Sequence, residues 1–150
     1  MKLSLLGMVL VMSCAAAQSK PAEPWRVEVR TEGGIAGKGI GSYAVSSDGT
    51  ISVVSMARVA CTFRATDEEL DRIRTLLANA HPETWRASYA PEDRCCDRIE
   101  YTLTVDQAGT VHTTEWIDDA LPMPKDLSAL AGAMTGPKPS LRDTYSARCR

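Results

Sequence analysis

The chain has 150 residues, of which 44% are hydrophobic and 24% charged, and its formal net charge is −2. This length supports one domain, the hydrophobic share excludes a disordered chain, and the near-neutral charge argues against a broad nucleic-acid-binding surface. Beyond the N-terminus, no apolar run approaches the roughly 20 residues that span a bilayer.

Residues 1–17 have the pattern of an export signal. Lys2 supplies a positive start, and the apolar run at 3–12 is too short for a transmembrane helix. Residues 11–14 (VMSC) resemble a lipobox, in which Cys14 would be acylated and become the mature N-terminus; the alternative is ordinary cleavage after Ala17. We therefore expect a cell-envelope protein, either a periplasmic lipoprotein anchored to the membrane or a secreted protein. Residues 18–24 would be a short tether.

The pattern of the first half of the domain predicts hairpins. Residues 25–30 alternate apolar and charged side chains, which predicts a half-buried strand, and a glycine-rich loop follows at 33–39. Residues 40–45 and 50–54 flank Asp48-Gly49, a strong hairpin turn signal. We expect the second arm of this hairpin to continue toward Cys61 and Phe63.

A helix should begin after Thr66, because Thr66 and Glu69 have the spacing of a capping box. The helical spacing of apolar residues at 70, 73, 76 and 77 predicts one buried stripe, and His81-Pro82 should end the helix. Residues 83–94 should be irregular.

The pattern of the second half of the domain predicts another hairpin and a short helix. Residues 97–106 and 110–117 form the arms of the hairpin, residues 118–124 a loop, and the apolar residues from Leu127 to Met134 a short helix. The expected fold is therefore α+β, in the order βββ-α-ββ-α: an antiparallel sheet with a main helix and a short C-terminal helix packed on one face. The domain would span residues 25–134, with a tail at 135–150 held by Cys149.

The cysteines indicate disulfide bracing. Apart from Cys14, the chain carries an even set, which in an oxidising compartment predicts two bridges. Vicinal cysteines very rarely bond each other, so we expect Cys95 and Cys96 each to reach one of Cys61 and Cys149. Which of them pairs with which stays open.

The sequence carries no recognisable catalytic apparatus. It has no H-E-x-x-H or G-x-S-x-G motif, and the glycine-rich loop lacks a phosphate-binding pattern. His81 and His112 are far apart in the sequence, and His112 should be a solvent-facing strand residue. We expect packing roles for Trp25, Trp85 and Trp116. These features predict no enzyme, no metal and no cofactor.

An ordered set of segments resembles the emfourin family, small bacterial proteins named for inhibition of the thermolysin-like metallopeptidase protealysin. The set comprises the opening strand with GGIAG at 33–37, the helix from Thr66, DRIEYTLTV at 97–105, His112-Thr113, and DDALP at 118–122 before the final helix. The resemblance covers residues 25–134. It implies an α+β inhibitor that occludes a metallopeptidase active site from outside.

For an inhibitor of this kind we expect two candidate contact segments, the first of them within the glycine-rich loop at 33–39. The first is Gly33, Gly34, Ile35, Ala36 and Gly37, in which Ile35 would insert between glycines that permit close backbone approach. The alternative is that these glycines only permit a tight strand connection. The second segment is Asp118 and Asp119, whose carboxylates could approach a catalytic zinc, although a solvated turn is the ordinary role for such a pair.

Three hypotheses about function follow. The first is an exported protein-binding domain that inhibits a thermolysin-like metallopeptidase and is held at the membrane through an acyl anchor on Cys14. The second is an envelope interaction or structural lipoprotein of the same fold without inhibitory activity. The third is an enzyme whose Cys, His or Asp groups meet only in the folded chain.

Overall fold

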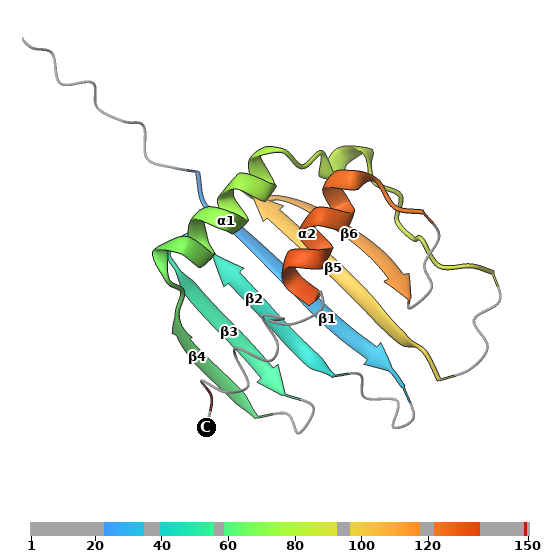
Figure 1. Ribbon diagram of the computed structural model, residues 1–150, viewed down its shortest axis with the longest axis horizontal. Helices are drawn as coiled ribbons and strands as arrows, with labels where there is room; N and C mark the ends of the chain where they lie inside the picture. The colour runs from blue at the N-terminus through green and yellow to red at the C-terminus, as the bar shows by residue number, and fades with distance from the viewer. Residues whose placement is uncertain are drawn as a thin grey trace, which may run out of the picture.

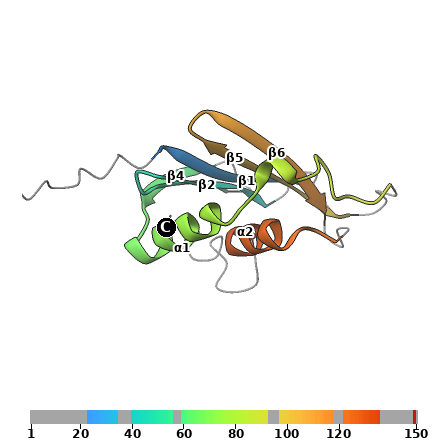
Figure 2. The same cartoon turned by 90° about the horizontal axis from the view of Figure 1, so that it is seen from above.

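The computed structural model describes residues 23–34, 40–55, 59–92, 97–117, 122–135 and 149. Six strands form one antiparallel sheet in the order β4-β3-β2-β1-β5-β6 (Figure 1). Both helices lie on the same face of this sheet (Figure 2). The elements are β1 (Trp25–Gly33), β2 (Gly41–Ser46), β3 (Thr50–Ser55), β4 (Ala60–Arg64), α1 (Asp67–Ala78), the 3₁₀ turn η1 (Pro82–Thr84), β5 (Ile99–Gln107), β6 (Thr110–Ile117) and α2 (Lys125–Thr135). The predicted α+β class, with two helices on one face of an antiparallel sheet, is confirmed.

Strand β1 lies inside the sheet, and its alternating side chains divide between the two faces of the sheet. Val27 and Val29 point into the core, where both are fully buried. The intervening charged residues Arg26, Glu28 and Arg30 point to the other face. On either side, β1 pairs antiparallel with β2 and with β5.

Residues 60–64 correct one sequence prediction. They do not extend the preceding arm but form a separate strand, β4, which runs back along β3 with Phe63 opposite Ile51 and Cys61 opposite Val53. Four strands therefore precede α1 instead of three. The sequence does not signal this reversal, because residues 55–59 contain no glycine, proline or asparagine.

The predicted capping box starts α1. The Glu69 N–H donates to the Thr66 hydroxyl oxygen at 3.2 Å, and the Thr66 N–H donates to the Glu69 carboxylate at 2.8 Å. Both groups would otherwise lack a partner at the helix start. The helix ends at Ala78, slightly before the predicted His81-Pro82 boundary, and Asn79 forms its C-cap.

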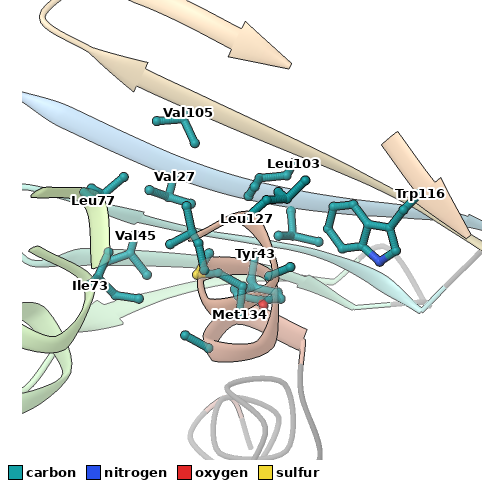
Figure 3. Packing of buried hydrophobic residues seen from close by; sticks show 14 of the residues in the cluster. Val27, Tyr43, Val45, Ile73, Leu77, Leu103, Val105, Trp116, Leu127 and Met134 are labelled. Atoms are coloured by element: carbon teal, nitrogen blue, oxygen red, sulfur yellow. The ribbon is translucent and has the colours of Figure 1, made fainter. Parts of the chain in front are cut away.

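The core lies between the sheet and the two helices (Figure 3). Helix α2 places Leu127, Leu130 and Met134 there, and none of the three is exposed. Each such side chain stabilises the fold by about 1.5–3 kcal/mol relative to an exposed one. The sheet contributes buried residues to the same cluster, among them Val27, Val45, Leu103 and Val105. Among the described residues, no helix has the length and apolar character needed to cross a membrane.

A disulfide joins Cys61 in β4 to Cys149, with the two Cα atoms 5.9 Å apart and 88 residues between them in sequence. It holds the end of the chain at the outer strand of the sheet, as predicted for Cys149. The expected pairing of each of these cysteines with a vicinal cysteine is wrong, because Cys61 and Cys149 bond each other. Cys95 and Cys96 lie outside the described residues, as does Cys14.

Candidate functional site

Both segments that the resemblance singles out leave the sheet at the same end. At the end of β1, Gly33 lies opposite Ile99, and at the end of β6, Ile117 lies opposite Glu100. Only β5 separates the two exits, so they are two strand spacings apart, about 10 Å. The arrowheads of β1 and β6 in Figure 1 point to this end. Of the implied contact residues, Gly33 and Gly34 are described, whereas Ile35, Ala36, Gly37, Asp118 and Asp119 lie outside the described residues.

Hydrogen bonds hold both ends of the connection between β1 and β2, and the Thr31 hydroxyl makes those at the β2 end. This hydroxyl donates to the Gly41 carbonyl oxygen at 2.6 Å and accepts from the Ile40 N–H at 2.8 Å. On the other side of β1, the Gly34 N–H donates to the Arg98 carbonyl oxygen at 2.9 Å. Thr31 is buried, so these bonds are shielded from competing water. The chain is therefore fixed where it enters and leaves this connection.

Backbone geometry alone requires glycine at Gly33. Its φ is +81°, a conformation that residues with a Cβ rarely adopt, and a Cβ there would collide with the Arg98 carbonyl oxygen. The same holds at the other end of the connection, where Gly41 has φ +105° and a Cβ would collide with the Val54 carbonyl oxygen. A purely structural requirement of the strand connection therefore suffices to explain glycine at position 33, without a role in binding.

A hollow of about 400 Å³ lies on the face of the sheet that carries Glu28 and Arg30, opposite the buried Val27 and Val29. Both helices lie on the other face (Figure 2). Its lining comes from β1, β5 and β6: Glu28, Arg30, Glu32, Glu100, Thr102, Thr104 and Glu115. The register brings these residues together, because Arg30 lies opposite Thr102, which in turn lies opposite Glu115. Sequence reasoning missed this group. The alternating polar side chains of β1 and of β5 were its signal, and they do not reveal that these two strands lie side by side.

Asp126, in the first turn of α2, ties this helix to the segment that follows α1. Its carboxylate accepts hydrogen bonds from the His81 N–H at 2.9 Å and from the Trp85 indole N–H at 3.0 Å. Burial raises the pKa of Asp126, but these hydrogen bonds outweigh burial and hold the pKa below its ordinary value of 3.8. These two hydrogen bonds hold the start of α2 against the connection between α1 and β5, which is a structural role.

His112 corrects another prediction. It lies opposite Val105, which is fully buried, so it points to the helix-covered face of the sheet and is half-buried. Its neighbour Val111 takes the outward position and is 58% exposed. The predicted strand at β6 is therefore correct, but the solvent-facing orientation predicted for His112 is wrong.

The tryptophans pack as predicted. Trp116 is buried and stacks on Tyr101, with the ring centroids 5.2 Å apart, while Trp25 and Trp85 lie partly buried against the core. Within the described ranges, no group of three or more His, Cys, Asp or Glu side chains could hold a metal ion.

No protein-family model, no curated protein and no solved structure matches this chain.

Proposed function

We propose that this chain is an exported protein-binding domain that inhibits a thermolysin-like metallopeptidase by occluding its active site. The observation that carries this proposal is the common exit of the two implied contact segments, next to Gly33 and next to Ile117. A separation of about 10 Å lets one concave active site meet both segments at once. The resemblance to the emfourin family supplies the class of target.

The held ends of the first segment support a binding role. Ordering a loose loop on binding costs free energy, so a tight inhibitor benefits from a connection whose ends are already fixed. The Thr31 bonds to Ile40 and Gly41 fix one end, and the bond from Gly34 to Arg98 fixes the other. A connection with fixed ends loses less conformational freedom on binding than one without these bonds.

The proposed location is the cell envelope, through the signal at 1–17 and an acyl group on Cys14. The disulfide between Cys61 and Cys149 supports an oxidising compartment, since such bonds are rare where thiols are kept reduced. Residues 18–24 would then tether the domain to the membrane surface. Mass spectrometry of the native N-terminus tests the anchor: an acylated Cys14 is expected, and a mature chain that starts after Ala17 would replace the lipoprotein with a secreted protein.

The inhibitory activity is tested by titrating the mature protein against a panel of thermolysin-like metallopeptidases. Inhibition at or below micromolar concentration is expected, and its absence across the panel would remove the proposal. The variants Ile35→Ala and Asp118→Asn/Asp119→Asn should each weaken inhibition. The matched control is Thr110→Ala, an exposed residue in the hairpin at the opposite end of the sheet, which should leave inhibition unchanged.

A second candidate is an envelope protein of the same fold that binds a partner without inhibiting it. The hollow on the open face of the sheet favours this candidate, because it lies on a surface that the inhibitory role does not require. Recovery of a defined envelope partner that is not a peptidase, together with no inhibition in the titration, would favour it over the first.

A further inference from the structure

We infer that the helix-free face of the sheet docks a partner protein that places a lysine or arginine side chain in the hollow over β5. This inference goes beyond the proposed inhibition and requires only the hollow and its charges. It holds whether or not the partner is a peptidase.

The hollow is a trough along β5. Thr102 and Thr104 are short side chains in its middle, and longer side chains rise on either side from β1 and β6. Arg30 and Glu115 flank Thr102 in one row across three strands. A space of about 400 Å³ is large enough to receive a long side chain between these walls.

The charges of the trough favour a cation. Four of its seven lining residues are glutamates, and Arg30 is its single basic residue. Glu28 is already paired with Arg26 at 3.1 Å, and Glu100 also has an interaction partner, which leaves the other two glutamates to receive a cation. In the part of the chain that the structure describes, neither Glu32 nor Glu115 has a basic side chain within ion-pair distance. Their carboxylates can accept hydrogen bonds from an incoming ammonium or guanidinium group without giving up a partner.

The surroundings of the trough favour a protein over a free ion. On the same face, β2 and β3 carry the small, partly exposed side chains Ser42 and Ser52, which lie in the rows of Arg30 and Glu28. Neither serine is bulky enough to keep a partner's surface away from the sheet at these positions. A macromolecule can therefore rest on this platform while one of its basic side chains enters the trough.

The test is an NMR titration of the ¹⁵N-labelled mature protein with the capped peptide Ser-Gly-Arg-Gly-Ser and with its lysine and glutamine counterparts. The basic peptides should shift the amide signals of Thr102, Thr104 and Glu115, and the glutamine peptide should not. Substituting Glu32→Gln and Glu115→Gln together should weaken binding of the arginine peptide about fivefold, because exposed ion pairs contribute modestly. The matched control is Glu68→Gln with Glu83→Gln, which removes the same charge from exposed sites outside the lining of the trough and should leave binding unchanged.

Three results would overturn the inference. The first is equal binding of the glutamine peptide, and the second is an equal loss of binding in the control pair. The third is self-association that disappears on substituting Glu32 and Glu115, measured by sedimentation, which would assign this face to a second copy of the chain. Because peptidase inhibition is measured separately, loss of one activity does not bear on the other.

Discussion

Thr31 and Gly41 are joined across the β1–β2 connection by a buried hydrogen bond of 2.6 Å from the threonine hydroxyl to the glycine carbonyl oxygen. The same hydroxyl accepts from the Ile40 N–H at 2.8 Å, so one side chain satisfies two backbone groups. The Thr31 side chain therefore joins the end of β1 to the start of β2, in addition to the backbone hydrogen bonds that pair these two strands.

Replacing this hydroxyl should destabilise the protein. Thr31→Val keeps the shape of the side chain but leaves the Ile40 N–H and the Gly41 carbonyl oxygen without their partner, which should lower the free energy of unfolding by about 1–3 kcal/mol. Thr31→Ser keeps the hydroxyl and should lose less. Urea denaturation of both variants measures the difference. An equal loss in the two variants would contradict this prediction, because the methyl group would then stabilise the position as much as the hydrogen bonds do.

Gly33 should tolerate no side chain. Gly33→Ala places a Cβ against the Arg98 carbonyl oxygen and also forces alanine to adopt a φ of +81°. Gly109→Ala is the matched control, because Gly109 has a φ of +86° and a Cβ added there would meet no atom within 4 Å. The left-handed conformation alone should cost about 1–2 kcal/mol in both variants, with a further loss only at Gly33. Equal midpoints in thermal unfolding of the two variants would contradict the collision.

Asp126 should make stability depend on pH in the acid range. Because hydrogen bonds from His81 and Trp85 hold its pKa below 3.8 in the folded protein, the unfolded chain binds a proton more readily than the folded one. Its stabilising contribution is therefore complete above the unfolded pKa and is lost as the pH falls through the folded pKa. The free energy of unfolding should decline more steeply below about pH 4 in the wild type than in Asp126→Asn.

Thermal unfolding of both proteins from about pH 2 to about pH 6, a range that brackets the ordinary pKa of a carboxyl group, measures this difference. The pKa of Asp48 is also lowered, chiefly by the hydrogen bond from the Thr50 N–H, and it acts in the same direction. Asp48 is present in both proteins, so its effect cancels in the comparison. Parallel pH profiles would contradict the role assigned to Asp126.

Cys149→Ser should release the thiol of Cys61. The thiol count of the denatured, unreduced protein should rise by one, and the free energy of unfolding should fall by about 2–4 kcal/mol, because a bond that closes a long loop restricts the unfolded chain. The double variant Cys61→Ser/Cys149→Ser should return the thiol count to that of the wild type without restoring stability. Peptide mapping that links Cys61 or Cys149 to a vicinal cysteine would contradict the assigned pairing.

The sequence alone determined the local features of this protein. The capping box of Thr66 and Glu69 marked the start of α1, because a cap depends on residues only three apart. The alternation through Val27 and Val29 predicted a half-buried strand, because the period of two is a property of the strand itself. The even set of cysteines predicted disulfide bracing for the same reason: it required no knowledge of which segments meet.

The tertiary structure decided everything that depends on segments distant in sequence. Only the strand order placed β1 between β2 and β5, and only the register put Arg30, Thr102 and Glu115 in one row beneath the hollow. The partner of Cys149 and the inward face of His112 were likewise fixed by packing. Many strand pairings are compatible with the same local patterns. The native pairing is the one that buries the most apolar surface while leaving no buried polar group without a hydrogen bond, and this depends on the whole chain.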